Sequence, residues 1–406
     1  MRLGVFLAAL PFLDCQLPAQ IAHPVQHPLS YTVALPASPF GLAVSADGNW
    51  VFIGLTATST TGGIAVVQRM GNRYALANVV PLNGATGIAL THDGKILIAA
   101  AGPEVYFLDV SGVSSRGANA VSVLGSISDG PNAGSIWVSV TQDDHWVFVC
   151  DEDTGQLTVI DLTVALPAGF PTSSIAGTIP LGASPTSIVF SLDGSTAYVT
   201  VERVSSLLGW PANCTQEGST NPTLVNPEGA IVFFNVAAAV SHPNAAVGSF
   251  AQFVPAGCSP VRVERSADGL TLYATARNNN EVLAFDPSRF ASDPMHAIIG
   301  SAPVGAAPVP VAWIDSGKLI VVGNSNRFLE PGVPQSLDVL DASELASGGG
   351  ASALVRTIPA GAFPRALLLS PDGGTLFLSN YDSNSLQVID AVRLATAERG
   401  RPAPGR

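Results

Sequence analysis

Charged and amide side chains recur at one point of this sequence's repeated strand pattern, just after the second apolar strand of several copies. Two further arginines, Arg262 and Arg365, stand near the start of the first strand of a copy. A guanidinium offers paired N–H donors, so these arginines could bind a carboxylate or a phosphate. The other ligand-binding candidates are Asp151, Glu152, Asp153, Arg203, Arg277, Asn279, Asn324, Arg327, Asn380 and Tyr381. For each of them the alternative is a solvated loop residue in an ordinary ion pair.

Catalytic and metal-binding patterns are weaker in this sequence. Glu202 follows a second strand and belongs to the same set of polar residues on the loop-rich face. The acidic run at residues 151–153 offers the hard oxygen ligands that Ca²⁺ prefers, but it lacks the spaced Asp, Asn and Gly residues of a dedicated calcium loop, which favours an exposed acidic turn. The sequence contains no HExxH, no phosphate-binding P-loop, no Gly-x-Ser-x-Gly elbow and no CxxC. We therefore expect no bound metal and no cofactor.

The elements that must position these side chains are seven copies of one pattern. Each copy has an apolar strand, a turn built on Asp-Gly or a close variant, a second apolar strand, a polar loop and a third strand. Asp-Gly between two apolar runs is a strong hairpin signal, because glycine accepts the positive φ of a tight turn. The turn aspartates are Asp47, Asp93, Asp143, Asp193, Asp268, Asp315 and Asp372. A period of roughly 45–50 residues matches a four-stranded propeller blade.

The repeat predicts an all-β fold, a seven-bladed β-propeller of four-stranded blades over residues 29–392. The last copy lacks its own fourth strand, because only a polar tail, residues 393–406, follows it. The run LSYTVALP at residues 29–36 precedes the first copy and has the pattern of an unpaired fourth strand. We therefore expect the N-terminal strand to complete blade seven and close the ring, which removes exposed sheet edges.

Blade four carries an insertion, since the fourth and fifth turn aspartates are separated by roughly 25 residues more than the period. The extra segment, at about 203–228, falls in the loop between the second and third strands. In a propeller this loop shares a face with the connections between blades, so Cys214 and Cys258 are expected to form a disulfide over the channel mouth. Two unrelated buried thiols are the alternative. Cys150 ends a strand and is expected to be a buried core thiol.

The N-terminus has the features of an export signal. Residues 1–19 combine a positively charged start, an apolar core and a small residue before the expected cleavage point, and a proline-rich segment, residues 20–28, follows. The apolar core is too short to span a membrane. We expect a secreted or periplasmic protein with no integral membrane segment after cleavage. Lipidation at Cys15 is the alternative, although Asp14 stands where a small residue would precede a modified cysteine.

The charge balance limits the partners of the protein. The chain has 18 Lys and Arg against 30 Asp and Glu, a net charge of −12. A phosphate backbone requires a concentrated basic surface, so this balance argues against nucleic acid as a partner. Anionic membrane surfaces are disfavoured for the same reason. We expect a monomer whose partner is an unidentified protein or small-molecule ligand.

The copies resemble the YVTN family of β-propellers, whose unit runs Pro-x-Gly-Ile-Ala-Val-Ser-Pro-Asp-Gly, then Tyr-Val-x-Asn and Val-x-Val-Ile-Asp. The closest copies are FPRALLLSPDGGTLFLSNYDSNSLQVIDA, from Phe363, and SPTSIVFSLDGSTAYVTVE, from Ser184. The resemblance covers nearly the whole chain after the signal and implies a propeller. The family includes secreted surface proteins, binding modules and lactonase-like enzymes, so the resemblance does not select a function.

The lactonase-like branch supplies one enzymatic alternative. In that branch a His-Pro-Arg-His type start of the first strand and a Glu after the second strand contribute to the central funnel. Here Arg365 retains the Pro-Arg pair, Ala366 stands where the histidine would be, and Glu202 resembles the Glu position. The resemblance therefore implies that a hydrolytic site would use Glu202 with Arg262 or Arg365. Our interpretation is an exported β-propeller acting as a binding or interaction scaffold, with its ligand site on the loop-rich face around the central channel. The alternatives are a lactonase-like hydrolase acting on a sugar lactone and a structural protein of the cell surface or envelope.

Overall fold

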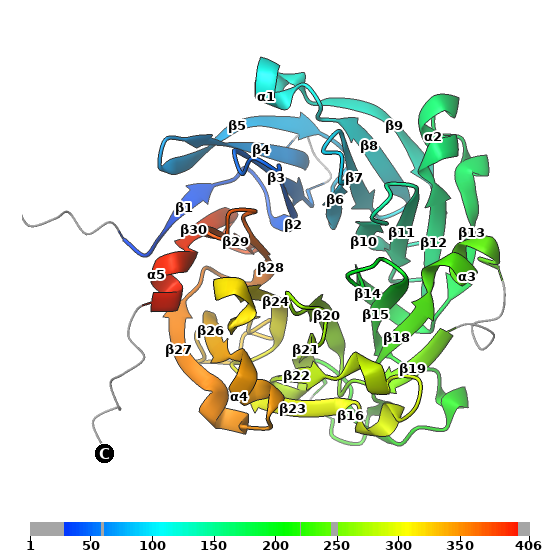
Figure 1. Cartoon of the computed structure of the whole chain (residues 1–406), viewed down its shortest axis with the longest axis vertical. Coiled ribbons are helices and arrows are strands. Elements are labelled where there is room, and N and C mark those ends of the chain that lie inside the picture. The colour runs from blue at the N-terminus through cyan, green and yellow to red at the C-terminus, as the bar shows by residue number, and fades with distance from the viewer. Residues whose placement is uncertain (1–27, 58–60, 220, 245–250, 397–406) are drawn as a thin grey trace, which may run out of the picture.

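Seven four-stranded antiparallel sheets form the blades of a ring around a central axis (Figure 1). The computed structural model describes residues 28–57, 61–219, 221–244 and 251–396. The first strand of each copy is the innermost strand of its blade, and the later strands follow outward. The predicted fold class, an all-β seven-bladed β-propeller, is confirmed.

The strands of each blade, from the axis outward, have the following bounds. Blade one is β2 (Pro39–Val44), β3 (Trp50–Leu55), β4 (Gly63–Met70) and β5 (Arg73–Pro81); blade two is β6 (Ile88–Leu90), β7 (Ile96–Ala101), β8 (Glu104–Asp109) and β9 (Ser122–Ser128). Blade three is β10 (Ser135–Val140), β11 (Trp146–Asp151), β12 (Gln156–Asp161) and β13 (Ile175–Pro180); blade four is β14 (Ala183–Phe190), β15 (Thr196–Arg203), β18 (Ala230–Asn235) and β19 (Ala251–Pro255).

The remaining blades follow the same order. Blade five is β20 (Pro260–Arg265), β21 (Leu272–Ala276), β22 (Glu281–Phe285) and β23 (Ile298–Pro303); blade six is β24 (Pro308–Ile314), β25 (Leu319–Asn324), β26 (Ser336–Asp341) and β27 (Leu354–Pro359). Blade seven is β28 (Pro364–Leu369), β29 (Thr375–Asn380), β30 (Ser385–Asp390) and the N-terminal β1 (Ser30–Ala34).

The N-terminal strand closes the ring as predicted. β1 pairs antiparallel with β30, from Ser30 opposite Ile389 to Ala34 opposite Ser385. Its Val33 side chain is buried in the core between blades seven and one. A strand from the start of the chain therefore joins the last blade to the first.

The turns between the first and second strands explain why the repeat is visible in the sequence. In blade one the Asp47 carboxylate accepts a hydrogen bond from the Ser45 hydroxyl, whose oxygen accepts from the Trp50 amide at 3.0 Å. Gly48 has a φ of 68°, which a residue with a Cβ adopts only with strain. The same hydroxyl–aspartate bond recurs in blades two, three, four, five and seven. In blade six Ile314 replaces the hydroxyl residue.

The hydrophobic cores lie between neighbouring blades. The core between blades three and four, for example, combines Phe148 of one with Phe234 of the other. The inner strands approach still more closely, because a Cβ on Gly87 would lie 2.6 Å from the Cα of Trp137. Each blade therefore depends on both neighbours for the burial of its apolar faces.

Short helices follow the third strands of five blades. They are α1 (Val113–Arg116), α2 (Leu162–Ala168), α3 (Val236–Ser241), α4 (Ala342–Ala346) and α5 (Ala391–Thr396). The acidic residue that ends the third strand caps the helix: Asp161 accepts from two amides of α2, and Asp341 from two of α4. α5 corrects the prediction of a polar tail from residue 393, since Leu394 is fully buried and residues 393–396 belong to this helix.

The N-terminal predictions lie outside the described residues. This applies to the signal peptide at residues 1–19, to Cys15 and to nearly all of the proline-rich segment at residues 20–28. Residues 397–406 of the tail are likewise not described. Within the described ranges no helix is long and apolar enough to cross a membrane.

The burial of Val33 gives a direct test of ring closure. Val33→Asp places a carboxylate in the core between blades seven and one, and we expect it to lower the free energy of unfolding by about 3 kcal/mol. Thr32→Asp, on the exposed side of the same strand, should change this free energy by less than about 0.5 kcal/mol. Chemical denaturation of both variants measures the two effects, and equal effects would contradict closure by β1.

Candidate functional site: the channel mouth

Charged and aromatic side chains from several blades meet at the loop-rich end of the central channel. Four of them occupy the same position of the repeat, at the end of the second strand, in blades three, four, five and seven. Two arginines join them from the innermost strands β20 and β28. We call the group the channel mouth; it consists of Glu152, Glu202, Arg262, Arg277, Arg365 and Tyr381.

Arg277 is the centre of an ion-pair network in this mouth. Its side chain is 2% exposed, and its Nη2 donates to Glu202 Oε1 at 2.8 Å. Its Nε and Nη2 also donate to the two carboxylate oxygens of Glu217, which belongs to the insertion. Burial alone would lower the pKa of Arg277, but the charges of the two glutamates raise it. Arg277 is therefore a fully compensated cation.

Arg262 and Arg365 are buried without such compensation. They are 5% and 8% exposed. Arg262 Nη1 donates to the carbonyl oxygens of Thr186 at 2.7 Å and Val261 at 3.1 Å. Its Nε and Nη2, and the Nε of Arg365, have no hydrogen-bond partner among the residues that the structure describes. The ion pairs formed by the described residues include neither arginine.

Aromatic rings position both guanidinium groups. The Arg365 Cζ lies 4.1 Å from the centroid of the Phe40 ring, and the Arg262 Cζ lies 4.2 Å from that of Trp137 and 5.9 Å from that of Phe40. A cation–π contact stabilises by about 0.5–2 kcal/mol, less than the several kcal/mol that burial of an uncompensated ion costs. The Phe40 ring therefore lies close to two cations, which the aromatic rings orient but do not neutralise.

Burial and neighbouring charges shift the pKa values of the groups at the mouth. Burial, together with the neighbouring charge of Arg262, lowers the pKa of Arg365 well below its usual value. Burial also lowers the pKa of Arg262 to about 10. Burial raises the pKa of Glu152, and the charge of Glu202 adds to this rise. An anion beside the two arginines would reverse their shifts, because an opposite charge stabilises the protonated guanidinium.

A cavity of about 220 Å³ lies in the channel and is bordered by Trp137, Arg262 and Glu264. The Glu264 carboxylate, on β20, accepts a hydrogen bond from the Arg265 amide at 3.1 Å. The Glu264 side chain is half-buried among the inner strands, and burial raises the pKa of Glu264 to about 7. The wall of the cavity therefore changes its charge near neutral pH.

The insertion covers one side of the channel mouth. Its strands β16 (Ala212–Thr215) and β17 (Val225–Pro227) pair as a hairpin between β15 and β18. The predicted Cys214–Cys258 disulfide is present and joins the hairpin to the connection before blade five. Cys150 is buried and free, also as predicted. The disulfide is consistent with an oxidising compartment.

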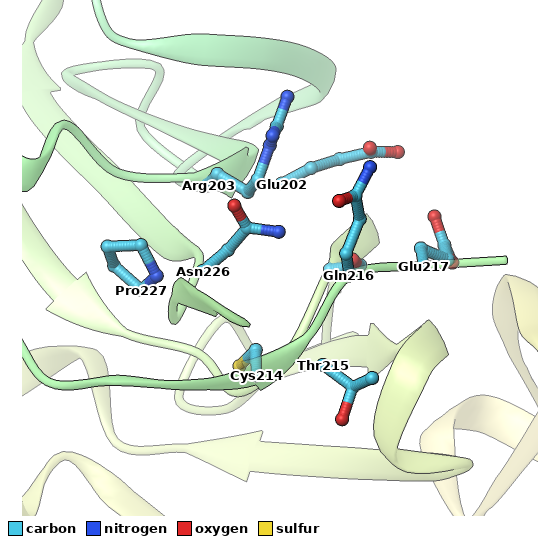
Figure 2. Close-up of a pocket in the computed structure, with 9 residues that line it drawn as sticks. Glu202, Arg203, Cys214, Thr215, Gln216, Glu217, Asn226 and Pro227 are labelled. Atoms are coloured by element: carbon cyan, nitrogen blue, oxygen red, sulfur yellow. The ribbon is translucent and has the colours of Figure 1, made fainter. Parts of the chain in front are cut away.

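A smaller pocket of about 170 Å³ lies between the hairpin and β15. Figure 2 shows Glu202 and Arg203 above the part of the hairpin that carries Glu217. Asn278 Nδ2 holds this part of the hairpin by donating to the Thr215 carbonyl at 2.7 Å. The pocket therefore opens beside the ion pairs of Arg277.

Three predicted ligand-binding residues lie away from the mouth. Asp151, Asn324 and Asn380 end their second strands and are each 0% exposed. Asn324 Nδ2 donates to Asp338 at 2.8 Å, and Asn380 Nδ2 donates to Gln387 at 3.3 Å. Successive residues of a strand point to opposite faces, so the residue that follows each of them is the one nearer the channel. These three side chains form hydrogen bonds within their own blades.

Asp151 forms a buried carboxyl pair with Asp129. The Ser135 hydroxyl lies within hydrogen-bond distance of both carboxyl groups, and the Thr158 hydroxyl donates to Asp151 at 2.6 Å. Burial, reinforced by the charge of Asp129, raises the pKa of Asp151 to about 8. The acidic run at residues 151–153 therefore does not present three carboxylates on one surface. Within the described residues, no group of three or more His, Cys, Asp or Glu side chains is placed to hold a metal ion.

The other predicted residues are exposed around the mouth. Asp153, Asn279 and Arg327 follow second strands on this face, and Arg203 is the last residue of β15. Asn279 Oδ1 accepts a hydrogen bond from the Cys258 amide at 2.6 Å, so it supports the disulfide-bearing loop. The charge of Arg327 is close enough to contribute to the lowered pKa of Arg365.

Sequence analysis missed three residues that contact the channel mouth, namely Phe40, Trp137 and Glu217. Phe40 and Trp137 stand at apolar strand positions and had the pattern of core residues. Alignment of the copies could have revealed them, because Phe40 is equivalent to Arg365 and Trp137 to Arg262. Glu217 had no such signal, since it lies in the insertion, outside the repeat.

Comparison with known proteins supports the fold but assigns the chain to no family. No protein-family model and no curated protein sequence matches the chain. Among solved structures it is similar to the hydrazine synthase of Kuenenia stuttgartiensis, with a TM-score of 0.62, 18% identity, and coverage of 88% of this chain and 96% of that chain.

Two further propellers show a comparable likeness. One is a putative 6-phosphogluconolactonase from Bacteroides fragilis, with a TM-score of 0.60, 14% identity, and coverage of 86% of this chain and 92% of the other. The second is the β-propeller domain of Cps50 (Swd1) from Myceliophteria thermophila, with a TM-score of 0.60, 12% identity, and coverage of 89% and 99%. At these identities the likeness establishes the fold alone, and the YVTN relationship stays a prediction.

The raised pKa of Glu264 predicts a pH-dependent stability. A carboxyl whose pKa is higher in the folded state, about 7, than in the unfolded chain destabilises the fold progressively as the pH rises from about 5 to 8. Glu264→Gln should therefore raise the free energy of unfolding by roughly 2–3 kcal/mol at pH 8 and by little at pH 5. Chemical denaturation at both pH values measures this. A gain of the same size at the two pH values would contradict the assignment.

Proposed function

We propose that this protein is an exported, YVTN-type binding scaffold that holds a small anionic ligand at the channel mouth, on the face that carries the insertion. One observation supports this most: Arg262 and Arg365 are buried beside the same aromatic ring with unpartnered N–H groups. A carboxylate or phosphate between them would accept charge-assisted hydrogen bonds and neutralise two buried cations. The signal-like N-terminus and the disulfide support export.

A lactonase-like hydrolase acting on a sugar lactone is the second candidate. The fold likeness to a putative 6-phosphogluconolactonase favours it, and so does the presence of Glu202 near Arg262. In that case the arginines would bind an acidic group of the substrate, and Glu202 would assist attack by water. Two features count against it: Arg277 holds the Glu202 carboxylate in an ion pair, and Ala366 stands where that branch has a histidine.

Titration calorimetry with inorganic phosphate and with malonate tests the anion site. We expect Arg262→Gln and Arg365→Gln each to weaken binding at least tenfold, the equivalent of about 1.4 kcal/mol. Arg356→Gln is the matched control, because Arg356 also has an unpartnered Nε but lies on the outer strand β27. Binding that all three variants retain would contradict the proposed site.

The same variants separate the two candidates. The wild-type protein is incubated with a panel of sugar lactones, and release of the free acid is followed by the drop in pH. Turnover that Glu202→Gln abolishes would establish the hydrolase. Anion binding without turnover of any lactone in the panel would support the scaffold. A folded protein that neither binds the anions nor opens a lactone would favour the structural surface protein.

A further inference from the structure

We propose that Glu217 is a built-in anion that closes the channel mouth, and that an anionic ligand enters by displacing its carboxylate from Arg277. The proposal rests on the anion site described above and adds how access to that site is controlled. The gate is the hairpin of β16 and β17 together with residues 216–219, and its counterpart is Arg277 at the end of β21.

The contact between Glu217 and Arg277 has the geometry by which arginine recognises a free carboxylate. Nε and Nη2 of the guanidinium face the two oxygens of Glu217, a paired arrangement that any carboxylate ligand would adopt. Glu202 binds the same guanidinium through Nη2 alone. Of the two glutamates, Glu217 is the one whose position does not depend on a blade strand, because it lies on a loop of the insertion. Its side chain is 18% exposed, so solvent reaches this carboxylate.

The hairpin can move without breaking its blade. β15 and β18 pair directly with each other, from Thr196 opposite Asn235 to Val201 opposite Ala230, so the ladder of blade four is complete without the insertion. β16 and β17 pair only with each other among the described strands. Departure of Glu217 from Arg277 therefore requires no loss of hydrogen bonds between the blade strands.

A small number of contacts hold the hairpin over the mouth. The Cys214–Cys258 disulfide fixes its first strand, and Asn278 Nδ2 donates to the Thr215 carbonyl. Gly218 lies near the Phe328 ring of the loop in blade six, since a Cβ on Gly218 would be 3.3 Å from that ring. The disulfide keeps the carboxylate near Arg277 even when the ion pair opens, which gives this internal anion an effective concentration in the millimolar range.

This arrangement makes Glu217 a competitor of the ligand. If the mouth is open for only a fraction of the time, the apparent affinity for a ligand is reduced by that fraction. Removal of the Glu217 charge should therefore tighten the binding of a small anion. It also leaves Arg277 with one carboxylate partner, which makes the mouth more positive and attracts anions from solution.

The binding test compares two substitutions on the same insertion. Glu217→Gln should tighten the binding of phosphate and malonate at least fivefold in titration calorimetry. Glu228→Gln removes the same charge at a residue that accepts from Asn213 instead of Arg277, and it should leave the affinity within twofold of wild type. Unchanged or weaker binding by Glu217→Gln would overturn the gate.

A second measurement requires no ligand. Phenylglyoxal modifies accessible arginines, and mass spectrometry maps the modified positions. Arg277 should be protected in the wild type and modified at least threefold faster in Glu217→Gln and in the Cys214→Ser/Cys258→Ser double variant. Exposed Arg116 should react equally in every form. Equal protection of Arg277 in all forms would overturn the gate. If no protein form binds an anion, the proposed function fails while this labelling still decides the gate.

Discussion

The pairing of β1 with β30 is the constraint on which the rest of the molecule depends. Each hydrophobic core lies between two blades, so a ring with an open joint would expose the apolar faces of blades seven and one. Closure by backbone hydrogen bonds prevents this and fixes how far each innermost strand lies from the axis. The residues at equivalent places in the blades are thereby held as rings of side chains around the channel, and the mouth combines one such ring with two arginines of the innermost strands.

Within that rigid ring the charges are arranged unequally. Arg277 has two carboxylate partners, whereas Arg365 has an aromatic face, and Arg262 has an aromatic face and backbone carbonyl groups. Cation–π contacts contribute about 0.5–2 kcal/mol each, and the burial of an uncompensated ion costs several kcal/mol. The stability of the propeller therefore offsets a local electrostatic cost at the mouth. Sites that combine such a cost with a rigid frame are typical of binding and catalytic centres.

The sequence predicted the propeller fold better than it predicted the residues of the channel mouth. Hydroxyl, aspartate and glycine at fixed offsets, or close variants of them, determine the inner turns locally, so seven copies revealed seven blades and the unpaired N-terminal strand. The disulfide followed from the loops that share a face. Asp151 and Glu152 show the limit: they are neighbours in sequence, but the alternation of a strand sends one into a buried carboxyl pair and the other to the channel. Glu217 was beyond prediction because its place is set by tertiary contacts of a loop that no other copy contains.

The complete ladder between β15 and β18 also has an evolutionary meaning. An insertion that contributes no strand to any blade is free to change length and composition while the propeller keeps its core and its turns. Selection can therefore act on the cover of the channel and on the ring beneath it as separate traits. A lineage that exchanged this loop for another would inherit an unchanged scaffold with a different entrance, so related propellers are expected to diverge first at this position.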